Sequence, residues 1–226
     1  MTYTLIARCP RSGAFGIGIA TYSLAVGAKC PAITTGIGAL TTQAFVNPTF
    51  KVLGLRLFGQ GHPAEQVLDL LRGADPDFEY RQVALIDRRG DAACHTGTKT
   101  RQWSGHRIGD GFVALGNVLK GEAVLAAMAE AYQAGGTLEL AERIMRSLKA
   151  GRVAGGQQGL DGPLPERSAS LLCTTGRSTR SSICGSIPIP TPSPSCDACS
   201  MSSSPTSRSI VSAGGSQPLL RLKMHL

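Results

Sequence analysis

The sequence predicts an α+β fold, and three patterns indicate it. Two runs rich in β-branched and aromatic residues open the chain around a turn that contains Pro and Gly, which is typical of a β-hairpin. A second pair of such runs flanks a shorter turn near the middle of the chain. Two amphipathic, Ala-rich helical patterns follow, suited to packing on a sheet. The predicted strands are Thr2–Arg8, Ala14–Thr21, Gln82–Asp87 and Ala92–Thr96, and these two helices are Glu122–Tyr132 and Leu138–Lys149.

The first predicted strand begins at the start of the chain, and its second residue, Thr2, is small. Aminopeptidases that remove the initiator Met act before small residues, so we expect the mature chain to begin at Thr2. That residue would then carry a hydroxyl and a free amine. Because an α-amino group titrates near ~8, it could accept the hydroxyl proton and activate Thr2 as a nucleophile. The alternative is that Thr2 is an ordinary residue of a frayed terminus.

Short strands and helices are predicted next. Ala25–Ala44 is Gly-rich and apolar, which predicts two short strands around Gly36–Gly38. A dinucleotide-binding loop is excluded there, because no third Gly follows at the required spacing and no helix begins. Helical patterns run from Pro48 to Gln60 and from Pro63 to Leu71, the second with a proline in its first turn.

Three amide side chains follow predicted strands and allow two interpretations each. Gln43 and Asn47 flank a strand end before Pro48, and Asn117 follows the strand Gly111–Leu115. As amide donors near Thr2, they could stabilise an oxyanion or bind substrate. Alternatively, Gln43 and Asn47 form a turn and a helix start, and Asn117 caps a helix.

The four histidines, at positions 62, 95, 106 and 225, lack the spacing of a zinc site formed by one element. We therefore expect no metal and no cofactor. His106, within Trp103–His106, is a candidate substrate contact, and the alternative is a histidine satisfied within the core or a turn.

The C-terminal quarter differs from the rest. A loop at Gly155–Pro163 precedes the strand Arg167–Leu172, which we expect to complete the sheet. We predict one domain over residues 1–172 and a disordered tail over 173–226, because the tail is rich in Ser, Thr, Pro and Arg and has no periodicity. Because codon choices are degenerate, a shifted reading frame permits a strand, an acidic turn and a helix start there. We therefore expect a frameshift near the codons for residues 172 and 173, which would leave the protein unstable or inactive. The spacing of Cys196 and Cys199 would then result from the altered frame and would not mark a redox or zinc site.

Composition restricts the function classes. The formal net charge is +8, and residues 173–226 hold five basic side chains and one acidic, or +4 of it. No cluster of Lys and Arg contains interleaved aromatics, so we expect no nucleic-acid partner. No apolar run reaches 18 residues and no signal peptide is present, so we expect no membrane partner and a cytoplasmic location. The seven cysteines are irregularly spaced, which argues against a disulfide framework.

Several motifs in this order resemble the family catalogued as domain of unknown function 1028, over roughly residues 2–172. They are Thr2–Arg8, Gly16–Ala20, Gly36–Ala39, Thr42–Pro48, Trp103–His106 and Gly116-Asn117. The resemblance implies the N-terminal nucleophile (Ntn) hydrolase fold, a four-layer αββα sandwich of two antiparallel sheets between helix layers. In that architecture the nucleophile is the first residue of the mature chain.

The sequence thus supports two function classes. The first is an amidohydrolase that cleaves a small amide or peptide-like C–N bond, with Thr2 as the nucleophile. Gln43, Asn47, Asn117 and His106 are its oxyanion or substrate-binding candidates. The second is a non-catalytic binding or structural protein on the same scaffold. A homo-oligomer is compatible with either class.

Overall fold

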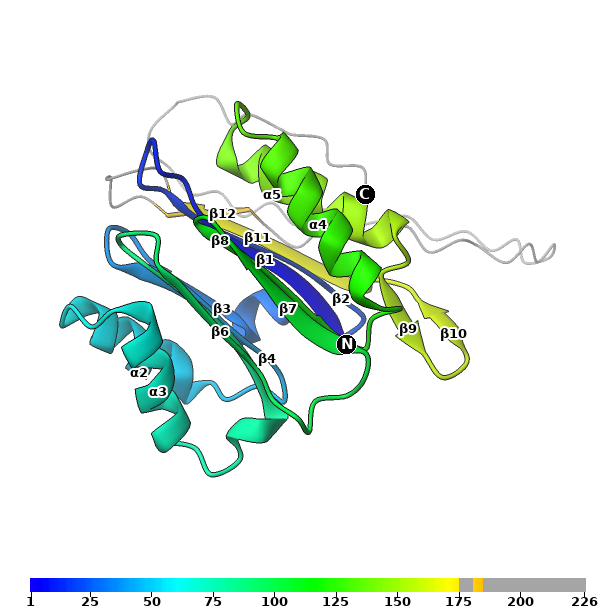
Figure 1. The fold of residues 1–226 in the computed structure, drawn as a ribbon, viewed down its shortest axis with the longest axis horizontal. Coiled ribbons are helices and arrows are strands. Elements are labelled where there is room, and N and C mark those ends of the chain that lie inside the picture. Colours follow the sequence, from blue (N-terminus) through cyan, green and yellow to red (C-terminus); the bar gives the residue numbers. More distant parts are fainter. Residues whose placement is uncertain (175–180, 185–226) are drawn as a thin grey trace, which may run out of the picture. The chain divides into compact units, whose positions relative to one another are not determined.

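The computed structural model describes residues 1–174 and 181–184. Within them, two antiparallel sheets pack face to face and a pair of helices covers the outer face of each (Figure 1). Both the predicted α+β class and the predicted sandwich are confirmed. None of the helices in these residues is long and apolar enough to cross a membrane.

The larger sheet has six strands in the order β12-β11-β2-β1-β8-β7. These strands are β1 (Thr2–Arg8), β2 (Phe15–Thr21), β7 (Ser104–Gly109), β8 (Phe112–Asn117), β11 (Ser168–Thr174) and β12 (Ser181–Cys184). The first strand is central, between β2 and β8. Its register places Thr2 opposite Thr21 on one side and Asn117 on the other. Thr2 therefore lies at one end of the sheet, flanked by two polar residues.

Helices α4 (Glu122–Ala134) and α5 (Leu140–Val153) cover the outer face of this sheet. Alternate residues of a strand face opposite sides, so Leu5 packs beneath these helices while Ile6 faces the second sheet. Two glycines let α5 approach β2. A Cβ atom at Gly16 or Gly18 would lie 2.4 or 2.3 Å from side-chain carbons of Ile144.

The smaller sheet has the order β3-β4-β5-β6, with helices α2 and α3 on its outer face. Its strands are β3 (Pro31–Thr34), β4 (Gly38–Ala44), β5 (Arg81–Asp87) and β6 (Ala92–Thr96), and the helices are α2 (Thr49–Gly59) and α3 (Ala64–Gly73). Leu40 and Leu85 pack against Phe50 and Val67 of the helices. An apolar layer between the sheets joins the two halves of the core.

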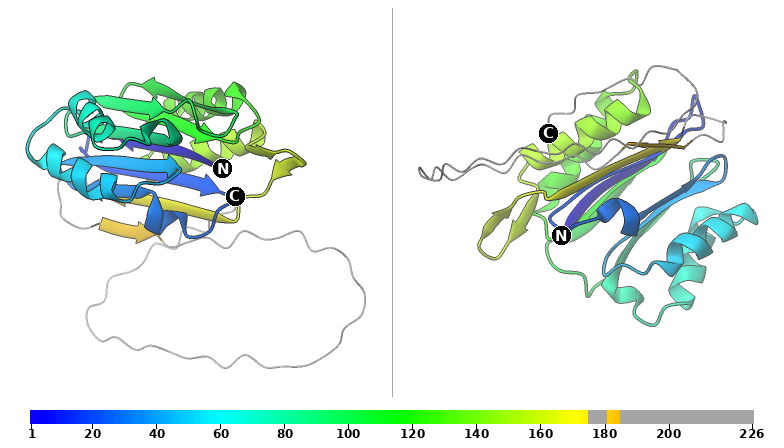
Figure 2. Two further views of the ribbon diagram at one scale, coloured as in Figure 1. Left: turned by 90° about the horizontal axis from the view of Figure 1, so that it is seen from below. Right: turned by 180° about the vertical axis from the view of Figure 1, so that it is seen from behind.

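The structure differs from the sequence predictions in several elements, one of which is the unpredicted edge strand β7 (Ser104–Gly109). The loop expected at Gly155–Pro163 contains a small hairpin, β9 (Gln157–Gly159) and β10 (Gly162–Leu164), which extends beyond the start of β1 (Figure 2). A two-residue turn closes it, and Gly162 has a φ of 122°, which glycine tolerates. A helical turn, α1 (Val26–Lys29), and a short 3₁₀ segment, η1 (Phe78–Tyr80), were not predicted.

The boundary expected at residue 172 falls within β11, and β12 pairs with β11 in the same sheet. The remainder of the predicted tail, including Cys196 and Cys199, lies outside the described residues. So does most of the segment to which the frameshift hypothesis applies.

Candidate active site

Thr2 is buried at the end of β1, with 6 % of its surface exposed. Its hydroxyl donates a hydrogen bond to the Met1 carbonyl oxygen at 2.5 Å. The hydroxyl of Thr21 donates to the same oxygen at 2.5 Å, and the two hydroxyl oxygens lie 3.1 Å apart. The Met1–Thr2 peptide is therefore held by two threonine hydroxyls from adjacent strands.

Two cavities adjoin this strand end. The larger, of about 260 Å³, is lined by residues that include Met1, Thr2, Thr21, Lys29, Cys30 and Gln43. The smaller, of about 170 Å³, is lined by Met1, Ser23, Ala44, Phe45, Arg101 and Asn117. Met1 is a common wall of both cavities. Its removal would leave the Thr2 amine at the boundary between them.

The electrostatic environment favours a neutral amine at this position. Burial, assisted by the positive charge of Arg101, lowers the pKa of the Met1 amine to about 6. Burial also raises the pKa of the Cys30 thiol to about 11, so this cysteine remains protonated near neutral pH. An amine here can act as a base at pH 7, whereas Cys30 is not a competing nucleophile.

Of the four polar candidates predicted to surround Thr2, two line these cavities. Gln43 lines the larger cavity and is fully buried, and its Oε1 accepts a hydrogen bond from the Thr4 hydroxyl at 2.6 Å. Asn117 lines the smaller cavity from the last position of β8. It is not the N-cap of α4, because that helix begins at Glu122 after Gly121.

Asn47 lines neither cavity, and its side chain is engaged elsewhere. Its Oδ1 accepts hydrogen bonds from the backbone nitrogen and the hydroxyl of Thr49, at 3.1 and 2.6 Å. Its Nδ2 donates to Asp75 Oδ2 at 2.8 Å. These contacts at the start of α2 favour the helix-start interpretation.

His106 also lies outside both cavities, on the edge strand β7. Its Nδ1 is 2.9 Å from the Thr96 hydroxyl oxygen of β6. Burial is the main cause that lowers the pKa of His106, so the ring is neutral near pH 7. This contact links the edges of the two sheets.

Gln82, on β5, was not among the predicted residues, although its side chain joins the two sheets. Its Nε2 lies 2.9 Å from the Thr96 hydroxyl, 3.0 Å from the Gly105 carbonyl and 2.9 Å from the Gly116 carbonyl. Backbone carbonyls only accept hydrogen bonds, so the amide nitrogen must face them. The orientation of the buried Gln82 amide is therefore fixed.

That orientation determines how two cavity-lining amides are presented. Gln82 Oε1 accepts hydrogen bonds from Gln43 Nε2 at 2.8 Å and from Asn117 Nδ2 at 3.0 Å. An amide nitrogen carries two hydrogens, and this contact uses one of those on Asn117. Asn117 is thereby held with its NH₂ group as a donor at the site.

Strained backbone surrounds the same strand end. In the described part of the chain, the non-glycine residues with positive φ are Ala25 (59°), Ala44 (66°) and Val118 (54°). Ala44 lines both cavities, Val118 follows Asn117, and Ala25 lies between two residues of the larger cavity's wall. A β-branched residue in this conformation is unusual, and such strain concentrates at functional sites.

Sequence reasoning also missed Thr21 and Arg101. Thr21 could have been found, because counting back from the turn of the first hairpin pairs it with Thr2. Arg101 lies on the connection between β6 and β7, with its guanidinium carbon 5.7 Å from the centre of the Phe45 ring. No motif in the sequence places it beside the amino terminus.

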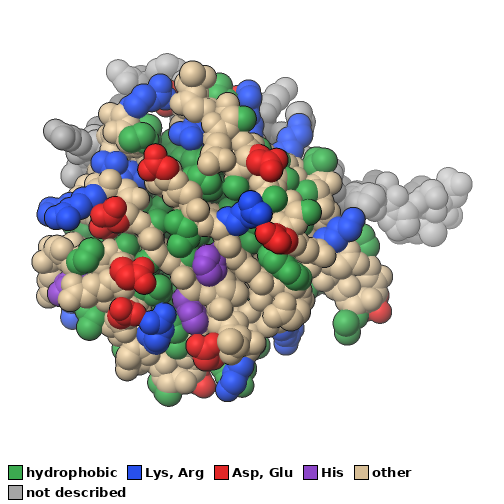
Figure 3. Space-filling model, viewed as in Figure 1, with side chains coloured by type: hydrophobic (Ala, Val, Ile, Leu, Met, Phe, Trp, Pro, Cys, Tyr) green, Lys and Arg blue, Asp and Glu red, His purple; other side chains and the backbone are tan. Residues whose placement is uncertain are grey.

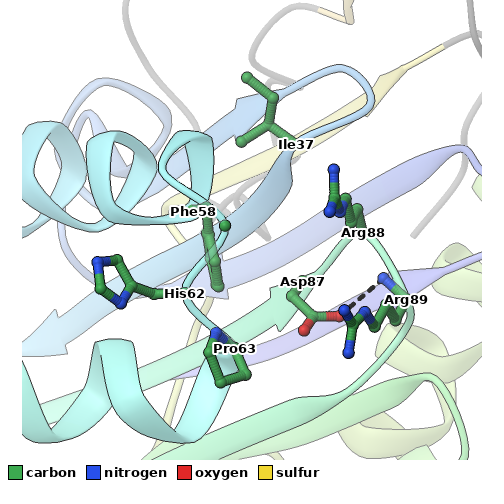
Figure 4. A pocket seen from close by; sticks show the side chains of 8 residues that line it. Ile37, Phe58, His62, Pro63, Asp87, Arg88 and Arg89 are labelled. Carbon is green, nitrogen blue, oxygen red and sulfur yellow. Dashed lines mark hydrogen bonds between the residues drawn. The ribbon is translucent and has the colours of Figure 1, made fainter.

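A third cavity, of about 90 Å³, lies at the opposite end of the smaller sheet (Figure 4). It is lined in part by His62, Asp87, Arg88 and Arg89, and includes none of the predicted site residues. Asp87 Oδ1 accepts hydrogen bonds from three successive backbone nitrogens of the following turn, including that of Arg89. This carboxylate stabilises the β5–β6 turn.

Basic and acidic side chains are mixed on the face shown in Figure 3. This face therefore presents alternating charge and no continuous basic surface.

Comparisons with known proteins place the chain in a family. Residues 2–185 match the model of a family of unknown function, DUF1028. The crystal structure of protein SPO2555 from Silicibacter pomeroyi, of the same family model, is similar with a TM-score of 0.69 and 29% identity. The match covers 76% of this chain and 75% of that chain. No curated protein matches. Because the family model spans most of its residues, the chain belongs to the DUF1028 family.

Proposed function

We propose that this protein is an amidohydrolase of the N-terminal nucleophile class, which becomes active when Met1 is removed and cleaves a small amide or peptide-like C–N bond. The observation that carries the proposal is the position of Thr2. Its buried hydroxyl and its backbone nitrogen lie at the end of a central strand, beside two cavities of a combined size suited to a small molecule.

In the proposed mechanism, Thr2 supplies both the nucleophile and the general base. The neutral Thr2 amine accepts the hydroxyl proton, and Oγ1 attacks the amide carbonyl carbon to form a tetrahedral oxyanion. The C–N bond then breaks, and the departing amine takes the proton from the Thr2 ammonium group. Water hydrolyses the resulting ester, which releases the carboxylic acid and restores the Thr2 hydroxyl.

Three features support these roles. Burial and Arg101, which lower the pKa of the Met1 amine, would act on the Thr2 amine in the same sense. The Thr21 hydroxyl, 3.1 Å from that of Thr2, can orient the nucleophile. Asn117 offers an amide hydrogen that Gln82 does not use, and such a donor suits an oxyanion.

The test replaces the nucleophile in protein whose amino terminus is verified by intact mass. Thr2→Ala should lower hydrolysis of a panel of small amides and dipeptides by roughly 10³-fold or more, because it removes the attacking oxygen. Thr2→Ser should retain part of the activity, since hydroxyl and amine survive. The fold should be unchanged in both.

The control is Thr137→Ala, on an exposed residue far along the chain. Thr4 is unsuitable as a control, because its loss would leave the buried Gln43 Oε1 without its donor. Equal hydrolysis by wild type and Thr2→Ala would refute the proposal. Retained Met1 or an acetylated amine would favour the non-catalytic alternative.

A further inference from the structure

The charges in the walls of the two cavities beside Met1 have one sign. Among the described residues that line these cavities, Lys29 and Arg101 carry charge, and none is Asp or Glu. Lys29 borders the larger cavity and Arg101 the smaller, so a cation stands on each side of the strand end. A ligand that enters this space meets a positive potential.

Neither cation is paired with a carboxylate of the described residues. In the part of the chain that the structure describes, the ion pairs involve other Arg residues and one His, and leave Lys29 and Arg101 without a carboxylate within 4.0 Å. The Arg101 guanidinium instead lies over the Phe45 ring, which packs edge-on against Tyr80 at 5.6 Å. This aromatic contact supports the guanidinium beside the smaller cavity, and among the described residues the Arg101 side chain has no hydrogen-bond acceptor.

Apolar side chains form part of the remaining walls. Val26 and Val46 line the larger cavity. Two large apolar side chains of the walls are exposed, Leu24 of the larger cavity at 61% and Phe45 of the smaller cavity at 41%. Apolar side chains beside unpaired cations suit a ligand with an apolar body and a negative group.

We propose that the site takes small amides that carry a free carboxylate and an apolar side chain, of the N-acyl amino acid type, with the carboxylate bound by Arg101. The planar guanidinium can bind both carboxylate oxygens at once, which the Lys29 ammonium cannot. This inference rests on the proposed function for the reaction, because the amide carbon must reach Thr2. The ligand preference itself can be measured without turnover.

The experiment compares two probes of nearly equal shape, N-acetyl-L-phenylalanine and N-acetyl-L-phenylalaninamide. Binding to the full-length Thr2→Ala protein, from which Met1 has been removed, is measured by isothermal titration calorimetry. The acid should bind about tenfold or more tightly than the neutral amide, because only the acid forms charge-assisted hydrogen bonds. Arg101→Met should abolish this preference, and Arg101→Lys should restore part of it.

The matched control is Arg107→Met, since Arg107 lies on β7 and pairs with Glu122. It should keep the full preference for the acid. Thermal melting confirms that each variant is folded, which is expected because Arg101 is exposed. Equal binding of the two probes, no binding of either at millimolar concentration, or a preference that survives Arg101→Met would each overturn the inference.

The two proposals fail separately. A preference for the acid in Thr2→Ala, combined with no hydrolysis of any N-acyl amino acid by the wild type, would refute the amidohydrolase and leave the ligand class standing. Hydrolysis of neutral amides at the same kcat/KM as their acids would refute the preference for carboxylates and leave the amidohydrolase proposal standing.

Discussion

Gln82 offers the sharpest test of how the two sheets are joined. Gln82→Leu would preserve the approximate volume and remove every polar contact of the side chain. The buried amides of Gln43 and Asn117 would lose their acceptor, and the Thr96 hydroxyl and the carbonyls of Gly105 and Gly116 would each lose one donor. An unsatisfied buried polar group costs ~1–3 kcal/mol, so the lower value applied to the two buried amides alone gives about 2 kcal/mol.

Gln82→Glu makes a more specific prediction, because its effect depends on pH. A protonated carboxyl can donate one hydrogen bond to a facing carbonyl, whereas an ionised carboxylate donates none and repels both carbonyls. Burial and this repulsion should raise the folded-state pKa of the new Glu above its unfolded value of ~4.3. The stability of the Gln82→Glu variant is then closest to that of the wild type below pH ~4.3, and it falls as the pH rises through the folded-state pKa of the new Glu.

Urea denaturation from about pH 4.5 to 8 measures the effects of both substitutions. A shift of the unfolding midpoint at an unchanged m-value reports a change in the free energy of unfolding. The control is Gln133→Glu, on the exposed face near the end of α4, with an expected change within ~0.5 kcal/mol. The reasoning is refuted if Gln82→Leu changes the free energy of unfolding by less than ~1 kcal/mol. It is equally refuted if the deficit of Gln82→Glu does not grow with pH.

The remaining predictions concern the amino terminus and the packing of α5. Acetic anhydride labelling of protein that retains Met1 should give an amine pKa of about 6; Arg101→Met should raise it by removing a nearby positive charge, while Arg107→Met should not. A value near ~8 in the wild type would contradict the buried environment. Gly18→Ala should lower the free energy of unfolding by ~1–3 kcal/mol, because its Cβ would lie 2.3 Å from a side-chain carbon of α5. Gly73→Ala, with no atom within 4 Å of its added Cβ, should be neutral or stabilising, and equal midpoints for these two variants would refute the packing argument.

The elements were largely predictable from local patterns. Alternation and turn residues located β1, β2, β5 and β6, and helical periodicity located α2 to α5, with boundaries displaced by a few residues. The β9–β10 hairpin was missed because its three-residue strands are too short to show alternation. Pairing between distant strands, such as β1 with β8, is a tertiary property that no local pattern contains.

The candidate site was predictable only where it coincides with strand ends. Thr2, Gln43 and Asn117 could be proposed because each ends or begins a predicted strand. Gln82 occupies a position where a polar residue would normally face solvent, and its burial follows from sheet-on-sheet packing. Arg101 reaches the amino terminus through a connection whose path depends on both sheets.

The arrangement makes the chemistry of the larger sheet depend on the smaller one. The proposed nucleophile lies on β1, yet Gln43 and Ala44 at the end of β4, and Phe45 after it, form much of the cavity walls. The donor face of Asn117 is set by Gln82, which also belongs to the smaller sheet. A change in sheet packing would thus alter the proposed oxyanion donor, Asn117, and the cavity together, even with Thr2 unmoved. Loss of activity in a Gln82 variant that remains folded is therefore expected to arise from misplacement of Asn117, and intact Thr2 alone should not suffice for hydrolysis.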